Sequence, residues 1–135
     1  MNKKIKKVVL IDDDDNTNVY NEFIIADTNM VDEIIIFQEA EKALAYLTTK
    51  DMNGDYPNPE IILLDINMPV MNGWEFIEAY EKLDKSQQAQ SIILMLSSSM
   101  NPDDRTKAEN IDAVSGFINK PISDIKFIEI VSKFF

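Results

Sequence analysis

Five short runs of apolar residues recur along the chain, and they constrain its fold more than any other feature. They occupy about residues 7–12, 33–37, 60–65, 91–96 and 116–119, so each run begins roughly 25 to 31 residues after the previous one. The first, third and fourth are continuously apolar rather than alternating, which is typical of strands covered on both faces. The spacing is that of repeated strand–helix units. It predicts a parallel sheet between two layers of helices.

The segments between these runs carry the periodicity and the capping residues of helices. A fourth helix is predicted to start where Asn101 precedes Pro102, and the last where Ser123 caps the C-terminal segment. The breaker-rich segment 51–59 predicts a loop. The patterns together predict one (βα)5 domain of residues 1–135. The apolar side chains that mark the first three helices are Val19, Phe23 and Ile24; Ala40, Ala43, Leu44 and Leu47; and Trp74, Ile77 and Tyr80.

The composition excludes several classes of site. The chain has 135 residues with no His and no Cys, which excludes the usual zinc sites, Ser-His-Asp and Cys-His nucleophiles, and disulfides. A net charge of −11 argues against direct nucleic-acid binding, which needs a basic face. The basic N-terminus, residues 2–7, is followed by too few apolar residues for a signal peptide, and no run is long enough to span a membrane. We therefore predict a cytoplasmic protein.

Polar residues of complementary chemistry follow four of the apolar runs. Acidic residues 12–15 follow the first run, Asp65 ends the third, hydroxyl residues 97–99 follow the fourth, and Lys120 follows the fifth. The carboxyl ends of parallel strands share one edge of a sheet, where open α/β proteins bind ligands. An acidic run can be a solvated loop, but carboxylates held together at a strand end need a cation, and Mg²⁺ fits that need. The pattern predicts phosphoryl chemistry with a divalent metal.

The segment from Leu64 to Gly73 is the most specific motif, since it matches the pattern Asp-x-x-Met-Pro-x-x-x-Gly. With this segment, the chain resembles the receiver domain of two-component response regulators over essentially its whole length. The resemblance implies a flavodoxin-like three-layer sandwich with strand order 2-1-3-4-5. The motifs that carry the resemblance occur in the family's order: Asp12 and Asp13, then Asp65, then Ser97, then Lys120-Pro121.

The resemblance also implies a role for each of these residues. Asp65 would be the phosphoacceptor, a nucleophile that forms an aspartyl-phosphate. Lys120 would offer a positive charge to the phosphoryl oxygens and Ser97 a hydroxyl donor, and this short set suffices for phosphoryl transfer. The Lys-Pro bond is often cis in the family. The Mg²⁺ ligands that the resemblance implies are Asp12, Asp13, Asp65 and the backbone carbonyl of Asn67.

Two positions depart from the commonest pattern of the family. Ser97 stands where Thr is frequent, so the hydroxyl donor is kept and the methyl group is lost. Phe117 stands where the switch aromatic is often Tyr, so any hydrogen bond from a Tyr hydroxyl is absent. The resemblance implies that phosphorylation acts through Ser97 and Phe117 on the surface of the fourth helix, fifth strand and last helix.

The resemblance implies partners of two kinds. A sensor histidine kinase or a histidine phosphotransfer protein would supply the phosphoryl group, and a downstream protein would read the altered surface. Because the chain ends with the last helix, we expect a stand-alone receiver, similar to a chemotaxis regulator, that contacts neither nucleic acid nor membrane directly.

The sequence leaves two functions other than a phosphorylated receiver domain to consider. The sequence Asp13-x-Asp15-x-Thr17 matches the nucleophile motif of haloacid-dehalogenase-type phosphatases, with Asp13 as the nucleophile. Against that enzyme, Asp12 separates the motif from the strand, and the Asp65 motif is left unexplained. The other alternative is a receiver-like interaction module that is never phosphorylated, but its acidic and basic site residues would then have no use.

Overall fold

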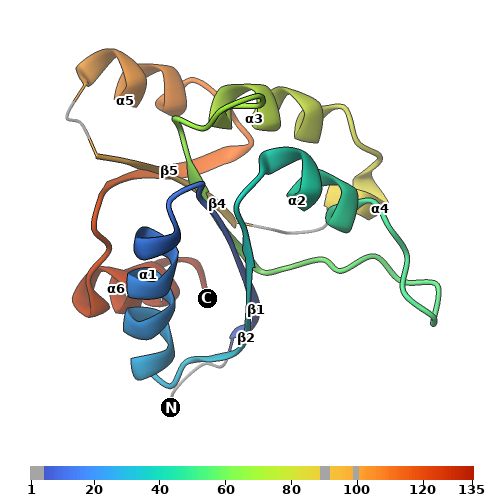
Figure 1. Cartoon of the computed structure of the whole chain (residues 1–135), viewed down its shortest axis with the longest axis horizontal. Coiled ribbons are helices and arrows are strands. Elements are labelled where there is room, and N and C mark those ends of the chain that lie inside the picture. The colour runs from blue at the N-terminus through green and yellow to red at the C-terminus, as the bar shows by residue number, and fades with distance from the viewer. Residues whose placement is uncertain (1–4, 89–91, 99–100) are drawn as a thin grey trace.

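The computed structural model describes residues 5–88, 92–98 and 101–135, and in these residues it contains five parallel strands and six helices (Figure 1). The sheet order is β2-β1-β3-β4-β5, which confirms the predicted flavodoxin-like topology. The strands are β1 (Ile5–Ile11), β2 (Val31–Phe37), β3 (Ile61–Asp65), β4 (Ile92–Ser97) and β5 (Val114–Asn119). The helices are α1 (Asp15–Asp27), α2 (Ala40–Leu47), α3 (Gly73–Glu81), α4 (Lys85–Gln88), α5 (Pro102–Glu109) and α6 (Asp124–Phe134).

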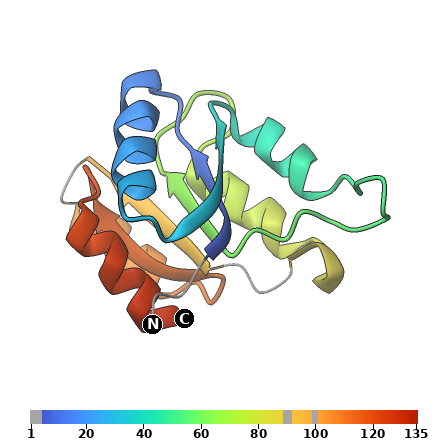
Figure 2. The ribbon, with the colours of Figure 1, turned by 90° about the horizontal axis from the view of Figure 1, so that it is seen from below.

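Helices cover both faces of the sheet, as the continuously apolar runs predicted. Figure 2 shows α1 and α6 on one side of the strands and α2 and α3 on the other. Each layer has its own core. Phe127 of α6 and Ile25 of α1 pack on one face, whereas Phe76 of α3 and Leu47 of α2 pack on the other. The central strand β3 is buried on both sides, with residues 61–64 completely inaccessible.

The orientation of α1 differs from the prediction. Val19 and Phe23 were expected to face the core, but they are 60% and 68% exposed, while Asn18 and Asn21 are buried at 1%. The start of the helix accounts for the difference. The Asp14 carboxylate caps α1, and the Asn18 amide donates a hydrogen bond of 2.7 Å to the backbone carbonyl of Asp12. Asn18 therefore faces inward together with Asn21 and Ile25, and Val19 and Phe23 face outward.

Other differences lie in short segments. The prediction missed α4, whose four residues carry no apolar periodicity. Two hydrogen bonds hold this helix instead. The Gln88 side chain donates to the carbonyl of Leu83 at 2.6 Å, and the Tyr80 hydroxyl donates to the carbonyl of Gln88 at 2.6 Å. Strands β1, β2 and β5 each begin two residues earlier than predicted, and β1 ends one residue earlier. Residue 91 of the predicted fourth strand, Ser99 and basic residues 2–4 lie outside the described residues.

The predicted caps and loop are confirmed. Asn101 caps α5 with Pro102 in the first turn, and Ser123 caps α6 through a hydrogen bond from the backbone N–H of Lys126. Segment 51–59 forms no helix or strand. None of the described helices is long and apolar enough to cross a membrane.

Candidate functional site

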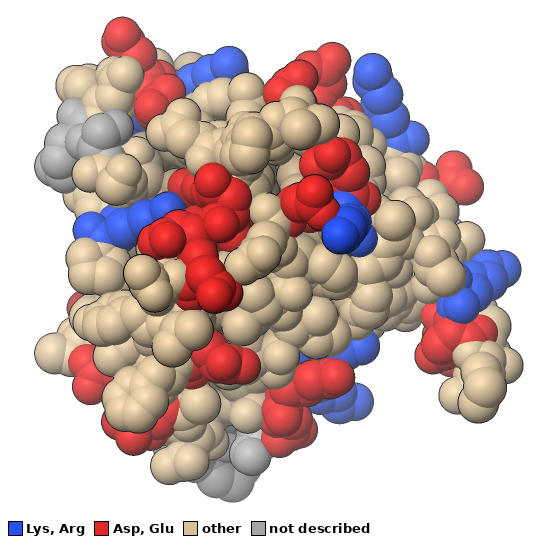
Figure 3. Space-filling view, in the orientation of Figure 1, with Lys and Arg blue, Asp and Glu red and all other residues tan. Residues whose placement is uncertain are grey.

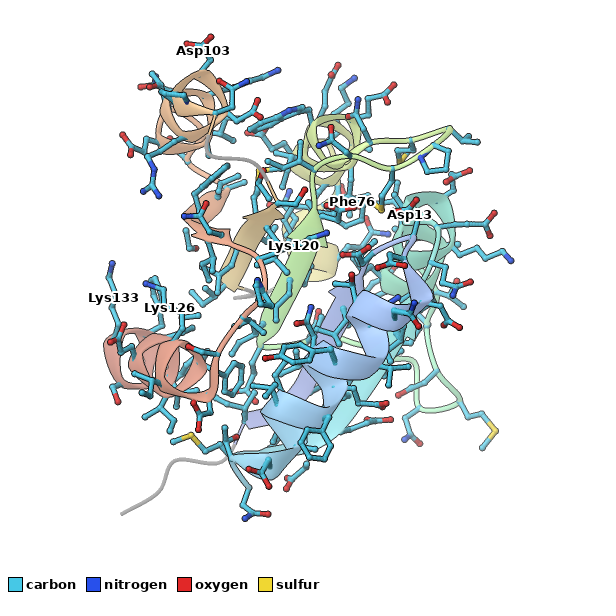
Figure 4. All side chains as sticks on the ribbon, turned by 60° about the vertical axis from the view of Figure 1, so that its left-hand side comes forward. Asp13, Phe76, Asp103, Lys120, Lys126 and Lys133 are labelled. Atoms are coloured by element: carbon cyan, nitrogen blue, oxygen red, sulfur yellow. The ribbon has the colours of Figure 1, made fainter. Side chains whose placement is uncertain are left out.

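The predicted site residues meet at the carboxyl edge of the sheet. Asp12 follows β1, Asp65 ends β3, Ser97 ends β4 and Lys120 follows β5. Strand register brings them together, because Asp65 pairs with Leu96, the residue before Ser97. Figure 4 shows Asp13 and Lys120 at this end of the strands. Parallel strands of matched register therefore assemble residues that are far apart in the sequence.

Lys120 bridges the two buried carboxylates of the site. Its Nζ atom lies 2.6 Å from Oδ2 of Asp12 and 2.9 Å from Oδ1 of Asp65. The side chains of Asp12 and Asp65 are only 3% and 7% exposed, and that of Lys120 is 15% exposed. Burying one charge between two opposite charges offsets much of its desolvation cost. Lys120 is therefore part of the site rather than a solvated surface lysine.

The pKa values of Asp65 and Lys120 are both raised, by burial in the first case and by hydrogen bonds in the second. Burial raises the pKa of the Asp65 carboxyl from 3.8 to about 6, the Lys120 ammonium opposes this rise, and the negative charge of Asp12 adds to it. Burial alone would lower the pKa of Lys120, but its hydrogen bonds to Asp12 and Asp65 outweigh burial, and the pKa is raised. Lys120 thus stays charged, and Asp65 is a carboxylate that water stabilises poorly.

Three carboxylates of the site could hold a metal ion. One oxygen from each of Asp12, Asp13 and Asp65 lies within 4.8 Å of the others, and among these Asp13 is exposed. Hard oxygen ligands with an open side toward water suit Mg²⁺, which usually keeps several waters. The donor set therefore fits the ion that was predicted. Asn67 lies in the exposed loop after β3, and its role as a carbonyl ligand stays a prediction.

The four consecutive acids divide into two pairs. Asp12 and Asp13 belong to the acidic cluster, whereas Asp14 and Asp15 serve the start of α1. A hydrogen bond from the Thr17 hydroxyl lowers the pKa of Asp14, which also accepts from the Thr17 backbone N–H at 3.2 Å. Asp15 accepts from the Gln38 side chain at 2.9 Å. Figure 3 shows acidic side chains gathered over the junction of β1 and α1.

Asn18 is a site residue that sequence reasoning missed. Its hydrogen bond to the carbonyl of Asp12, together with the bond of 2.9 Å from the Asp14 backbone N–H to Asp12 Oδ1, fixes the backbone and the carboxylate of Asp12. Asn18 lies one turn into α1, where a polar residue is normally placed in water. The sequence carries no signal that this Asn faces inward.

The loop that follows Asp65 is held close to the strand. The backbone N–H of Gly73 donates to the carbonyl of Ile66 at 2.8 Å, and a Cβ atom on Gly73 would lie 2.6 Å from the carbonyl oxygen of Asp65. Only glycine fits this approach. Asn72 and Glu75 then form a reciprocal capping box at the start of α3. The final Gly of the motif is therefore required by the packing behind Asp65.

Ser97 and Phe117 are the two residues of the predicted switch, and their role in it stays a prediction. Ser97 is buried, and its carbonyl accepts from the backbone N–H of Lys120 at 2.8 Å. Phe117 pairs with Met95, two residues before Ser97, and lines a cavity between α5 and α6. Its ring lies 5.3 Å from the Arg105 guanidinium. The bond between Lys120 and Pro121 is cis, as the resemblance implied.

Helix α5 contacts the rest of the domain through few side chains. Ala108 is its buried residue, and no other residue of the helix is buried. Lys107 lies over the Trp74 ring of α3, 4.6 Å from its centroid, and Arg105 lies over the Phe117 ring. The buried side-chain contacts of α5 are thus limited to one methyl group, and two cation–π contacts add to it.

Comparisons with known proteins agree with this geometry. A family model of the response regulator receiver domain matches residues 8–132. The structure of a two-component response regulator from Cytophaga hutchinsonii is 37% identical, has a TM-score of 0.87, and is matched over 97% of each chain.

Two further structures are similar in fold alone. A response regulator receiver protein from Dyadobacter fermentans is 24% identical, with a TM-score of 0.83 over 95% of this chain and 96% of that chain. The chemotaxis protein CheY4 of Vibrio cholerae is 24% identical, with a TM-score of 0.76 over 97% of this chain and 99% of that chain. No curated protein sequence matches the chain.

An open parallel sheet of this order, with carboxylates and a lysine at its carboxyl edge, defines a flavodoxin-like domain of the CheY type. The chain belongs to the response regulator receiver domain family. It is thus a receiver domain of two-component response regulators, and the phosphatase with Asp13 as nucleophile and the module that is never phosphorylated are not favoured. Receiver domains act as signalling switches rather than as turnover enzymes.

Proposed function

We propose that Asp65 accepts a phosphoryl group from a phosphohistidine of a histidine kinase or histidine phosphotransfer protein. The observation that carries the proposal is the buried Asp65 carboxylate with the Lys120 ammonium 2.9 Å away. A carboxylate oxygen bonds to phosphorus while the bond from phosphorus to the imidazole nitrogen breaks, and that nitrogen keeps the electron pair. A pKa of about 6 leaves Asp65 mostly ionised, and so nucleophilic, near neutral pH.

The other site residues stabilise negative charge during this transfer. Lys120 neutralises charge on the phosphoryl oxygens, and the Ser97 hydroxyl donates to one of them. When bound, Mg²⁺ would supply further positive charge for the transfer. The groups that would hold it are Asp12, Asp13, Asp65 and the backbone carbonyl of Asn67. We propose that residues 1–135 form one receiver domain that works in the cytoplasm.

The proposed output is a change in the surface of α5, β5 and α6. A phosphoryl group on Asp65 offers the Ser97 hydroxyl a stronger acceptor than the bare carboxylate does. Movement of the Ser97 segment toward it vacates space for the Phe117 ring to turn inward. Because that ring lies under Arg105, its rotation shifts α5. A downstream protein reads the result.

The acceptor is tested by mass spectrometry after treatment with acetyl phosphate and Mg²⁺. Wild type should gain the mass of one phosphoryl group, and Asp65→Asn should gain none while its circular dichroism stays that of a folded α/β protein. Asp15→Asn is the matched control, because Asp15 lies in the same acidic run but contacts Gln38 rather than the cluster. An adduct that persists in Asp65→Asn, or that maps to Asp13, would refute the assignment.

The output route is tested by hydrogen exchange with and without beryllofluoride, a mimic of the phosphoryl group. In wild type, the mimic should change exchange in residues 101–120. In Ser97→Ala the mimic should still bind, but the change in α5 and β5 should be largely lost. The same exchange pattern in both proteins would show that Ser97 does not carry the signal.

A further inference from the structure

The inner face of α1 buries two asparagines in a layer that is otherwise apolar. Asn18 and Asn21 are each 1% exposed, and they share this face with Ile25, which is fully buried. The Oδ1 atoms of both asparagines have no hydrogen-bond partner among the described residues. A buried acceptor without a partner destabilises a fold, so an apolar side chain would be more stable at both positions. Exceptions of this kind are expected at functional sites.

The two asparagines differ in what their amide groups contact. The Nδ2 atom of Asn18 donates to the backbone carbonyl of Asp12 at 2.7 Å, across six residues of the chain. In the part of the chain that the structure describes, no hydrogen bond joins Asn21 to Asp12 or Asp13. Asn18 therefore reaches the acidic cluster, and Asn21, one turn later on the same face, does not.

Asp12 is held at its backbone and at both of its carboxylate oxygens. The backbone N–H donates to the carbonyl of Phe37 at 3.0 Å, and the backbone carbonyl accepts from Asn18. The Oδ1 atom accepts from the Asp14 backbone N–H at 2.9 Å, and the Oδ2 atom lies 2.6 Å from Nζ of Lys120. Asn18 is the partner that fixes the carbonyl, so without it this group could turn where β1 leads into α1.

The direction of the backbone at Asp12 determines where two carboxylates lie. Asp12 and Asp13 are consecutive, and both belong to the cluster with Asp65, in which Asp13 is exposed. The carbonyl that Asn18 holds is part of the peptide group between Asp12 and Asp13. A turn of this peptide group would move the Asp13 carboxylate relative to the other two. Asn18 therefore controls the spacing of the three carboxylates.

Divalent ions differ in how much they depend on fixed spacing. Mg²⁺ demands a nearly ideal octahedron of oxygens, whereas Ca²⁺ accepts more oxygens in a flexible arrangement. We propose that Asn18 is a positioning residue that makes the acidic cluster selective for Mg²⁺ over Ca²⁺, by holding the peptide group between Asp12 and Asp13. Asn18 acts through the Asp12 carbonyl, without contact to the ion. The inference rests on the proposed metal site but not on phosphorylation of Asp65.

Titration of the protein with Mg²⁺ alone or with Ca²⁺ alone, followed by backbone amide chemical shifts, tests the proposal. Asn18→Leu and Asn18→Ala should each weaken Mg²⁺ binding by about tenfold or more, as expected when a residue that orients a metal ligand is lost. Ca²⁺ binding should weaken much less, so the ratio of the two dissociation constants changes. Asn21→Leu is the matched control, because it removes an equally buried amide from the same helix face, and it should bind both ions as wild type does.

The ratio separates positioning from a general loss of structure. A variant that is partly unfolded would bind both ions less well by the same factor, and its circular dichroism would differ from that of wild type. If both Asn18 variants keep the wild-type ratio, or if Asn21→Leu changes it as much, Asn18 does not set the selectivity. A wild type that binds neither ion at residues 12, 13 and 65 would refute the proposed metal site, and this inference with it.

Hydrogen exchange without metal tests whether Asn18 holds Asp12 in place. The Asp14 N–H, which donates to Oδ1 of Asp12, should exchange faster in Asn18→Leu than in wild type, because the Asp12 acceptor is then less fixed. In Asn21→Leu this amide should exchange as in wild type. Equal exchange of the Asp14 amide in all three proteins would show that Asp12 keeps its position without Asn18, and would overturn the proposal.

Discussion

Asp65→Asn should make the domain more stable at neutral pH, although it removes the proposed phosphoacceptor. In the folded state the pKa of Asp65 is raised from 3.8 to about 6, chiefly by burial. At roughly 1.36 kcal/mol per pKa unit, keeping this carboxylate ionised costs the folded state about 3 kcal/mol. Asparagine fills the same space without the charge. Since Lys120 loses one of its two carboxylate partners, we expect a net gain of about 1–2 kcal/mol.

The pH dependence identifies the origin of this gain. A folded-state pKa above the unfolded value means that folded wild type holds the Asp65 proton between about pH 4 and pH 6, where the unfolded chain has released it. Wild type therefore loses stability relative to Asp65→Asn as pH rises through this window. Urea unfolding of both proteins at several pH values without Mg²⁺ measures the difference. Asp112→Asn, at an exposed position between α5 and β5, is the control.

Two results would refute the reasoning. A difference in unfolding free energy that is constant from about pH 4 to pH 8 would mean that Asp65 titrates alike in both states. A variant less stable than wild type at pH 8 would mean that the pairing with Lys120 outweighs the burial of the charge. Either result would mean that the ionised carboxylate of Asp65 does not lower the stability of the folded state.

Three further outcomes follow from the same geometry. Lys120→Met should destabilise the domain by about 3 kcal/mol, because it leaves buried carboxylates without a cation. The loss, measured by urea unfolding, should be larger at pH 8 than at pH 5. Gly73→Ala should lower Tm by several degrees, because the added Cβ atom would lie 2.6 Å from a carbonyl oxygen. Val70→Gly should not lower Tm, because Val70 has a positive φ of 68° that glycine adopts freely. Calorimetry would measure both values. Asp13→Ala should weaken Mg²⁺ binding more than Asp15→Ala does, as isothermal titration would show; equal losses would mean that the acidic run acts as a diffuse charge.

Strand positions and strand ends could be predicted because they depend on local patterns. The continuously apolar residues 61–64 predict a strand covered on both faces, and β3 occupies the central position of the sheet. Since parallel strands end at one edge, Asp12, Asp65 and Lys120 had to come close together. The sequence could not show that Lys120 contacts both carboxylates, because that depends on side-chain distances across three strands.

The face of α1 could not be predicted because two signals in its sequence compete. Its apolar residues suggest that Val19 and Phe23 face inward, but the hydrogen bond from Asn18 to the Asp12 carbonyl sets the rotation of the helix. Periodicity counts every apolar residue as favouring burial, but here the polar Asn18 makes a buried hydrogen bond at the first turn, and Asn21 and Ile25 lie on the same buried face. The short α4 was missed because hydrogen bonds of Gln88 to Leu83 and Tyr80, rather than apolar periodicity, hold it.

The sparse attachment of α5 sets how strong a signal the domain can transmit. One buried methyl group and two cations over aromatic rings together hold this helix with about 2–3 kcal/mol. Coupling between two sites of a protein is usually about 1–3 kcal/mol. If Asp65 is phosphorylated as we propose, coupling of this size would be enough to displace α5 while the sheet stays intact. A helix anchored by several leucines would remain in place, and the domain would be phosphorylated without any response.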